Sequence, residues 1–284
     1  MEWIKRLNAA INYMEAHLTD GPDYEQLGRI ACCSAYHFQR MFGYMAGVSL
    51  SEYIRRRRMS RAAVDLQSTS EKIIDIAAKY GYESPTAFNR AFQGVHGFAP
   101  SQAREEGRIL ASFPPISFHI TIKGAVQMDY RIEKKEAFRI VGLSAPLAQE
   151  MEQNFEAVPK LWGKAAQDGS IATLCSLMNS LPTGVLGVSA CNGVAEQWRY
   201  YIAVASTLPA DGFEEYTVPA ATWAIFSGQG AGVSIQALEQ RIITEWLPTS
   251  GYEYGNGPDV EIYFDPTPEN TRYEVWIPVV KQNG

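Results

Sequence analysis

A block of some thirty residues occurs twice within the first hundred residues of this chain, and the duplication limits the folds that the chain can adopt. Five residues keep their identity and their order in both copies, fifty positions apart. They are Ser34, Phe38, Arg40, Phe42 and Gly47 in the first copy, and Ser84, Phe88, Arg90, Phe92 and Gly97 in the second. Because such a repeat encodes a repeated supersecondary unit, we expect two equivalent modules that present the same surface twice.

Each copy has the pattern of two helices joined by a short turn. Ser34 and Ser84 stand at favoured N-cap positions, and Gly47 and Gly97 stand where a helix ends. A helix over residues 50–67 connects the copies, and its ~17 residues span ~26 Å, which approaches the ~34 Å of one DNA turn once the flanking helices are added. The pattern predicts an all-α domain with two tandem helix-turn-helix units, which could enter successive major grooves without dimerising.

The outward side chains on the second helix of each unit are the candidate DNA contacts. Arginine can bond guanine O6 and N7 together, and glutamine or asparagine can pair with adenine, each pair giving ~1–3 kcal/mol of discrimination. The alternative is that these are ordinary solvated residues, but their recurrence in both copies argues against it. Arg40 and Arg90 are the leading candidates for base contacts. The whole set is Tyr36, Gln39, Arg40, Thr86, Asn89 and Arg90.

These residues resemble the DNA-binding domain of AraC/XylS-type transcription regulators. The match covers residues 5–106 and rests on Ser34-x-x-x-Phe38-x-Arg40-x-Phe42 and on Tyr80-Gly81-Tyr82-x-Ser84-x-x-x-Phe88-x-Arg90-x-Phe92. The resemblance implies that the chain binds double-stranded DNA at a promoter site. Gln93 and Ala103-Arg104 stand where the family usually has a basic residue and an aromatic-Arg pair, which weakens the phosphate contacts expected there.

The chain changes character after residue 107. Phe113-Pro114-Pro115 predicts a stiff junction, and residues 116–122 alternate apolar and polar side chains as a strand does. The first 108 residues carry 14 Lys and Arg against 12 Asp and Glu, whereas the remainder carries 11 against 19, so only the first part tolerates a polyanion. We expect a DNA-binding domain over residues 1–108, a linker and first strand over 109–124, and a second domain over 125–284.

Strand-like and helix-like segments alternate in the second part. Strands are expected over residues 139–143, 184–190 and 198–206, with a helix that runs through residue 162. The order returns with strands over residues 221–227, 260–264 and 272–280 and a helix over 234–246. Two passes of strand, helix, strand, strand predict a duplicated α+β domain, in which residues 199–203 align with residues 272–276.

Glu274 is the candidate ligand-binding carboxylate of the second domain. It lies in the apolar strand Tyr273-Glu274-Val275-Trp276-Ile277, where it shares a face with Trp276. A carboxylate with apolar neighbours must be paired, protonated or available to a cationic ligand. Tyr201 occupies the equivalent position of the first pass, so the two passes could enclose a cleft.

Trp223 and Tyr263 are candidate walls of that cleft, because aromatic faces attract both cations and apolar rings. Two other interpretations of Glu274 remain open. It could be exposed on an edge strand, or it could form an ion pair with an internal arginine such as Arg199.

The second part resembles GyrI-like effector-binding domains, which are duplicated α+β modules. The resemblance rests on Ala221-x-Trp223-Ala224-x-Phe226, Glu245-Trp246-Leu247-Pro248, Glu261-x-Tyr263 and Tyr273-Glu274-Val275-Trp276-Ile277-Pro278-Val279. It implies a cleft for lipophilic, often cationic compounds with a glutamate at the position of Glu274. The order of the two domains resembles the Rob-type arrangement. Some similar modules are hydrolases that use a tyrosine and a glutamate, which keeps Tyr201 with Glu274 open as a catalytic pair.

The sequence as a whole predicts a transcriptional regulator, an activator, that is tuned by a small hydrophobic or cationic effector. It is not expected to be an enzyme, since no nucleophile stands beside a base, although a hydrolase or a drug-sequestering protein with a DNA-binding appendage remains the alternative. The four cysteines and four histidines are not at ligand spacing, so no metal or cofactor is expected.

The chain start lacks a signal peptide and no apolar run reaches the ~18 residues of a membrane span, so we expect a cytoplasmic protein. RNA polymerase is a further candidate partner.

Overall fold

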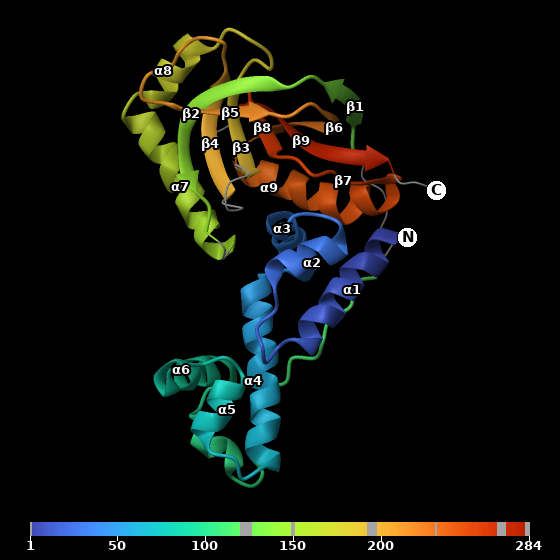
Figure 1. Ribbon diagram of the computed structural model, residues 1–284, viewed down its shortest axis with the longest axis vertical. Coiled ribbons are helices and arrows are strands. Elements are labelled where there is room, and N and C mark those ends of the chain that lie inside the picture. Colours follow the sequence, from blue (N-terminus) through green and yellow to red (C-terminus); the bar gives the residue numbers. More distant parts are fainter. Residues whose placement is uncertain are drawn as a thin grey trace. The chain divides into compact units, whose positions relative to one another are not determined.

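The computed structural model of the chain consists of two compact units, residues 1–120 and residues 121–284 (Figure 1). It describes residues 2–119, 127–148, 151–191, 198–230, 232–265 and 271–281. Among these residues, no helix has the length and apolar character that a membrane span requires.

The first unit is helical. It contains two helix-turn-helix units, which pack on opposite ends of one long helix, α4 (Leu50–Ser68). The elements are α1 (Glu2–Ala16), α2 (Tyr24–Ala31), α3 (Ala35–Ala46), α4 (Leu50–Ser68), α5 (Ile73–Lys79), α6 (Pro85–His96) and a 3-10 turn, η1 (Pro100–Arg104).

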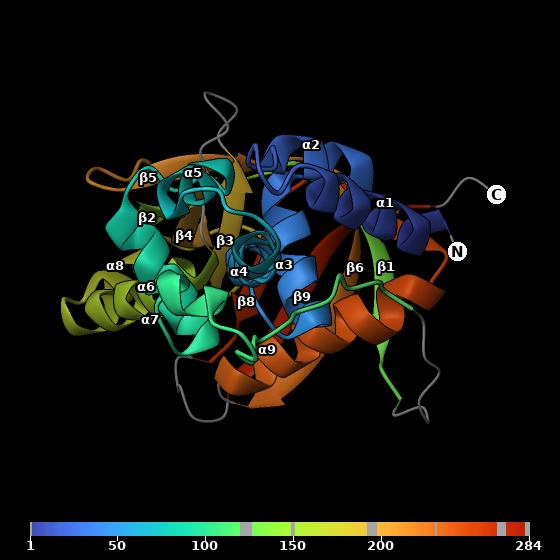
Figure 2. The same cartoon turned by 90° about the horizontal axis from the view of Figure 1, so that it is seen from below.

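Helix α4 is shared by two modules, and Figure 2 looks along it, with α1, α2 and α3 on one side and α5 and α6 on the other. The first module buries Phe38 and Phe42 of α3 together with the apolar face of α1. The second buries Phe88 and Phe92 of α6 against Met59 and other residues of α4. The inward positions predicted from the repeat are therefore confirmed in both modules.

Both second helices begin and end as the repeat predicts. Ser34 Oγ accepts a hydrogen bond from the His37 backbone N–H, and Ser84 Oγ accepts one from the Ala87 backbone N–H. The C-caps Gly47 and Gly97 have φ angles of 68° and 81°, a left-handed conformation that glycine adopts without a steric penalty.

Residues 108–119 do not form the strand that was expected from residue 116 onward. Residues 116–119 have no ladder partner, and residues 120–122 lie outside the described residues. The alternation of side chains is real, because Phe118 is buried and its neighbours Ser117 and His119 are exposed. Its cause is that this extended segment packs on the helices of the first unit, where Phe118 meets Phe42, rather than on a sheet.

The second unit is an α+β domain with one large antiparallel sheet. Its first pass contains β1 (Tyr130–Lys135), β2 (Phe138–Pro146), α7 (Met151–Gln167), α8 (Ser170–Leu177), β3 (Val185–Cys191) and β4 (Trp198–Ala205). Its second pass contains β5 (Glu214–Val218), β6 (Ala221–Gly230), α9 (Gly232–Arg241), a π-helical turn (Ile242–Trp246), a 3-10 turn (Leu247–Thr249), β7 (Tyr252–Tyr254), β8 (Asp259–Tyr263) and β9 (Thr271–Lys281).

The sheet has the order β1-β6-β9-β8-β3-β4-β2-β5, and β7 also pairs with β9. The order is symmetric about the β3–β8 pair, because each pass contributes equivalent strands to the two halves. The first strand of each pass is exchanged: β1 pairs with β6 of the second pass and β5 pairs with β2 of the first. The predicted duplication is therefore present, with an additional strand at the start of each pass.

The two faces of the sheet bury different sets of side chains. One face packs on α7 and α8 and includes Tyr200 and Ile202; we call it the helix face. The other buries Tyr201, Trp223 and Trp276, and we call it the inner face. Phe138 on β2 and Trp276 on β9 have ring centroids 6.5 Å apart although three strands separate them in the sheet, so the sheet curls around the inner face.

Candidate functional site

The predicted DNA-contacting positions of α6 lie together on its outer surface. Thr86, Asn89 and Arg90 are all exposed, while Phe88 and Phe92 on the opposite side of the helix are buried. Pro85 occupies the first turn of the helix and the helix ends at His96, so the polar face includes its N-terminal half. This is the half of a recognition helix that contacts base edges in helix-turn-helix proteins.

The equivalent positions of α3 are less accessible. Tyr36 and Arg40 are half-buried, and the Arg40 guanidinium lies 5.8 Å from the centre of the Tyr44 ring. The prediction that Gln39 faces outward was wrong, because its side chain is only 7% exposed. Gln39 lies four residues after Ala35 and three before Phe42, both buried, so it falls on the edge of the buried stripe of the helix.

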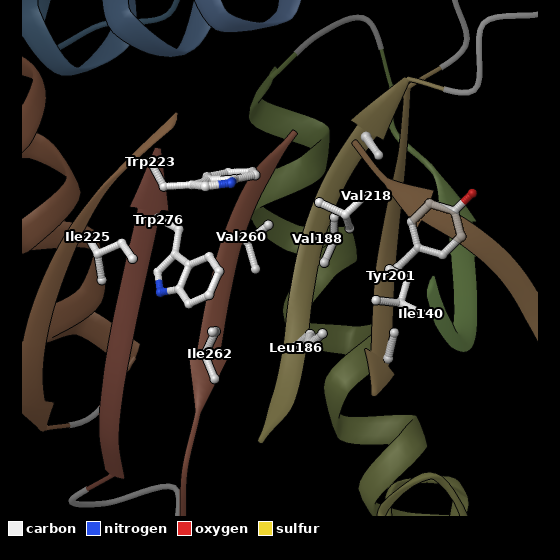
Figure 3. Packing of buried hydrophobic residues seen from close by; sticks show 12 residues of the cluster. Ile140, Leu186, Val188, Tyr201, Val218, Trp223, Ile225, Val260, Ile262 and Trp276 are labelled. Carbon is white, nitrogen blue, oxygen red and sulfur yellow. The ribbon is translucent and has the colours of Figure 1, made fainter. Parts of the chain in front are cut away.

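On the inner face of the second unit, four of the five predicted effector-binding residues share one surface. Tyr201, Trp223, Trp276 and Glu274 all project from this side of the sheet. Trp223 and Trp276 pack with their ring centroids 5.8 Å apart, and Figure 3 shows them next to each other, with Tyr201 farther along the sheet beyond Val188. The Trp223 indole N–H is buried and has no hydrogen-bond partner among the described residues.

Both carboxylate oxygens of Glu274 are engaged. Oε1 accepts a hydrogen bond of 2.8 Å from the Arg131 guanidinium, and Oε2 accepts one of 2.7 Å from the Trp276 indole N–H. Arg131 comes from β1, the first-pass strand that pairs with β6 of the second pass. Glu274 is therefore a carboxylate whose charge is balanced within the sheet.

Of the two alternatives considered for Glu274, the ion pair with an arginine is confirmed and the exposed edge strand was wrong. Its strand, β9, is interior, with β6 on one side and β8 on the other, so it is no edge strand. An arginine does bind it, but that arginine is Arg131 rather than Arg199. Arg199 instead bonds Ser144 and Glu214, because it lies at the end of β4, three strands from β9.

Tyr263 does not belong to the surface that carries Glu274, which corrects the predicted site. In the β8–β9 pair Ile262 lies opposite Glu274, so Tyr263, one residue further, projects from the helix face. There its hydroxyl donates a 2.8 Å hydrogen bond to Glu261 Oε2. The same oxygen accepts a 3.1 Å hydrogen bond from the Tyr200 hydroxyl, which itself accepts one from the Trp162 indole N–H.

We call Glu261, Tyr200, Tyr263 and Trp162 the glutamate–tyrosine cluster. Burial raises the pKa of both the Tyr200 and the Tyr263 hydroxyl well above 10, and the negative charges of Glu261 and Glu239 raise the pKa further. Both hydroxyls consequently remain protonated hydrogen-bond donors at neutral pH. Glu239, on α9, is itself buried, with 6% of its surface exposed.

A glycine on the neighbouring strand makes room for this cluster. Gly187 of β3 lies directly opposite Glu261 in the sheet. A Cβ atom at Gly187 would overlap the Tyr200 hydroxyl oxygen and would lie 2.8 Å from Glu261 Oε2. Sequence reasoning did not single out Glu261 as a functional residue. The signal that could have found it is Glu261-x-Tyr263, which places an acid and a tyrosine on the same face of one strand.

Comparisons with known proteins agree with this two-part organisation. A helix-turn-helix domain matches residues 27–106, and the GyrI-like small molecule binding domain matches residues 128–280. The Right origin-binding protein of Escherichia coli (strain K12) is 24% identical over 283 residues, which cover 94% of this chain and 95% of that protein.

Two other relatives, both named as helix-turn-helix regulators, match a shorter part of this chain. YbfP, an HTH-type transcriptional regulator of Bacillus subtilis (strain 168), is 36% identical over 104 residues, and the match spans 37% of this chain and about a third, 35%, of that protein. AarP, an HTH-type transcriptional activator of Providencia stuartii, is 37% identical over 92 residues, or 32% of this chain and 68% of that protein.

The family match over residues 128–280 covers more than half of the chain, and the helix-turn-helix match precedes it. The chain belongs to the AraC-type transcriptional regulators that combine a helix-turn-helix domain with a GyrI-like small molecule binding domain.

Proposed function

We propose that this protein reads a specific, asymmetric DNA site with both helix-turn-helix modules of one chain and activates transcription there. The observation that carries this proposal is the agreement between the modules: each has a serine N-cap, two buried phenylalanines and a left-handed glycine around its second helix. Helix α4, with 19 residues, gives the modules a common support of ~28 Å. Activation is supported by the similarity to AarP, which is described as an activator.

The side chains of α6 define what the second module would recognise. Arg90 carries a fork of donors that fits guanine, and the Asn89 amide fits adenine. Thr86 lies on the first turn and can bond a base edge or a phosphate. We propose Arg40 and Tyr36 as the corresponding contacts of α3, with Gln39 in a supporting role because it is buried.

The test is a DNA footprint of the full chain on a duplex selected from a randomised pool, at a stated salt concentration. Arg90→Ala is expected to lose about 1–3 kcal/mol of preference at one base position within the protected region. Arg40→Ala is expected to do the same about one DNA turn away. If both variants keep the wild-type base preferences and lose only overall affinity, the arginines contact phosphates and the proposed reading is wrong.

We further infer that a small hydrophobic cation is the effector and that it binds on the helix face, next to the glutamate–tyrosine cluster. Two acids, the half-buried Glu261 and the buried Glu239, act there on the same pair of tyrosine hydroxyls. Their negative potential favours a cation, and the rings of Trp162 and Tyr263, whose centroids lie 5.0 Å apart, offer aromatic faces to it. Glu274 is less suited, because Arg131 already balances its charge.

A binding role fits these residues better than hydrolysis does. A tyrosine nucleophile needs a lowered pKa, whereas burial raises the pKa of Tyr200 and Tyr263. The pair considered from the sequence, Tyr201 and Glu274, stands on β4 and β9, three strands or ~14 Å apart along the sheet. Both Glu274 oxygens also already accept hydrogen bonds, one of them from the Arg131 guanidinium.

Two carboxylate-to-amide variants test whether the effector binds on the inner face or on the helix face of the sheet. Calorimetric titration would compare tetraphenylphosphonium with neutral triphenylphosphine oxide on the full chain. Glu261→Gln is expected to weaken the cation at least about tenfold more than the neutral compound. Glu274→Gln is expected to weaken both to a similar, smaller extent. The reverse result would show that the effector binds on the inner face, next to Glu274.

The same titration, repeated with DNA present, tests regulation. An effector that regulates must change DNA affinity by the factor by which DNA changes effector affinity. If the cation binds but no such coupling is measured, and transcription from the selected site is unchanged, the second unit only sequesters the compound. Turnover of an ester substrate, abolished by Glu261→Gln or Glu274→Gln, would instead establish the hydrolase alternative.

A further inference from the structure

We propose that residues 108–119 act as a strap that holds the two helix-turn-helix modules at the separation needed to read DNA. This inference rests on the proposed DNA-reading function, and it adds a set of positioning residues that do not touch DNA. The segment follows the second module in sequence and then runs beside α4 and α1, where it is the green trace in Figure 1. It therefore returns along the helix that separates the modules.

Each end of the strap is fixed in the hydrophobic core of a different module. Leu110 packs against the core of the second module, which contains Phe88 and Phe92. Phe118 is 7% exposed, and its ring centroid lies 5.9 Å from that of Phe42 in the core of the first module. A change in the distance between the modules would pull one of these side chains out of its core.

Between these ends, the strap's backbone N–H groups bond side chains of both modules. Ala111 N–H donates to His96 Nδ1 of α6 over 3.2 Å, and Phe113 N–H donates to Ser60 Oγ of α4 over 3.0 Å. Further along, Ile116 N–H donates to the Tyr53 hydroxyl over 3.2 Å. At the last position Asn8 of α1 bonds both the N–H and the carbonyl of Phe118, over 2.8 Å and 2.9 Å. The partners move backward along α4 as the strap advances, so the strap is antiparallel to α4.

An ion pair ties the middle of the strap to two helices at once. Arg57 of α4 bonds Glu15 of α1 over 2.7 Å, with side chains only 10% and 16% exposed, and also donates to the Phe113 carbonyl oxygen. Tyr53 donates to the same Glu15 over 2.7 Å while it accepts the Ile116 N–H. Because these groups are largely shielded from water, loosening the strap would leave charged and polar atoms with fewer partners, which is costly.

The strap has the length and stiffness of a second strut. Eight residue steps from Leu110 to Phe118 span at most ~26–29 Å in an extended chain, close to the ~28 Å of α4. Pro114 and Pro115 fix their own φ angles and have no N–H group, so they favour an extended conformation and reduce the entropy lost on docking. A second connection that is anchored in both modules restrains bending between them more than α4 alone can.

The restraint matters because the second module binds at an effective concentration that depends on how firmly it is held relative to the first. A strapped protein should bind tightly at one spacing between the two half-sites and poorly at others. A loosened protein should bind the correct spacing less tightly but should tolerate altered spacings. The ratio of the affinities for altered and correct spacing therefore measures how firmly the strap holds the two modules. A general loss of folded protein would not change this ratio.

The experiment uses the full chain and three versions of one selected DNA duplex, with the original spacing and with one or two base pairs inserted between the half-sites. Asn8→Ala/Ser60→Ala removes hydrogen bonds to the strap at two separated points. Ile109→Ala/Ser117→Ala is the matched control, because Ile109 is 88% exposed and Ser117 is also exposed. Tyr53→Phe, which deletes the hydroxyl that accepts the Ile116 N–H and donates to Glu15, replaces the double variant if that variant does not fold.

We expect the wild type and the control to lose about thirtyfold or more in affinity when the spacing is altered, and the strap variant to lose about fivefold or less. A strap variant with the wild-type ratio would overturn the inference. Failure of the proposed DNA-reading function gives a different result: the wild type itself would show no sequence preference, or would protect only one half-site at every spacing.

Discussion

Both parts of this protein are duplications, but the two copies have been kept alike in the helical unit and have diverged in the sheet unit. The two helix-turn-helix modules have the same residues at the N-cap, at both buried phenylalanines and at the left-handed glycine. In the sheet, the equivalent central strands carry Tyr201 in one pass and Glu274 in the other. The difference follows from what each duplication must do.

The sheet unit contains one further substitution of this kind at its centre. Val188 lies opposite Tyr201, and Ile262 lies opposite Glu274, so Gly187 and Glu261 are also equivalent positions. They face each other across the β3–β8 pair, on the symmetry axis of the sheet. Two glutamates there would repel each other, whereas one glutamate beside a glycine leaves space for its carboxylate and two tyrosine hydroxyls. A single ligand site requires that the copies differ, while reading two DNA grooves requires that they agree.

The largest expected effect tests the agreement between the helical modules. Phe38→Ala and Phe88→Ala each remove a fully buried ring, so each should lower the free energy of unfolding by about 3–5 kcal/mol in urea denaturation. Phe155→Ala, at a position that is 55% exposed, is the control and should cost less than about 0.5 kcal/mol. A difference of more than about 2 kcal/mol between the two buried variants would show that the modules are not energetically equivalent.

The second effect tests the difference between the passes of the sheet. Gly187→Ala puts a methyl group against the Tyr200 hydroxyl and the Glu261 carboxylate, and overpacking of this kind should cost about 1–3 kcal/mol of unfolding free energy. It should also abolish tetraphenylphosphonium binding in the calorimeter. Gly163→Ala in α7 is the matched control: a Cβ there meets nothing within 4 Å, so stability should rise by about 0.5–1 kcal/mol. If Gly187→Ala binds the cation as tightly as the wild type does, the glutamate–tyrosine cluster is not part of the effector site.

Local signals explain why the helical unit could be predicted closely. Ser34 and Gly47 act on the turn in which they stand, and the period of Phe38 and Phe42 identifies the buried side of a helix without knowledge of its partner. The position of Gln39 could not be predicted in the same way. It lies on the border between the two sides of α3, where burial depends on the neighbours rather than on the period.

Pairing between distant strands explains what was missed in the sheet unit. Alternation correctly placed Glu274 beside Trp276, because both are on one strand. It could not place Tyr263, since a shift of one residue in the register of β8 moves the side chain to the opposite face. Arg131 was missed because it reaches Glu274 only through the exchange of β1, which no local pattern indicates. The edge strand β5 was missed because it is short and largely exposed, so it lacks a buried period.

A third, smaller effect concerns acid stability and the network that ties α1 to α4. Burial raises the pKa of Glu15, but hydrogen bonds from Arg57 and Tyr53 outweigh it and hold the pKa below 4.5. The folded state thus binds this proton less readily than the unfolded state, and Glu15 contributes stability above pH 4.5 that is lost as the pH falls toward its folded pKa. Urea denaturation between pH 5 and pH 3 should show a shallower decline for Glu15→Gln than for the wild type. A parallel decline would mean that other carboxylates carry the acid sensitivity; Glu156→Gln, on the exposed surface, controls for the loss of one charge.

The smallest expected effect tests whether the serine N-caps of the two modules contribute equally to stability. Ser34 Oγ is half-buried and accepts the His37 N–H over 3.1 Å, whereas Ser84 Oγ is exposed and accepts the Ala87 N–H over 3.4 Å. Ser34→Ala should therefore cost about 1 kcal/mol, and Ser84→Ala about half of that or less. Thermal unfolding of both variants gives the comparison, with Ser117→Ala as an exposed serine outside any helix. A larger cost for Ser84→Ala would mean that water does not replace the weaker bond, and that the second module depends on its cap as strongly as the first.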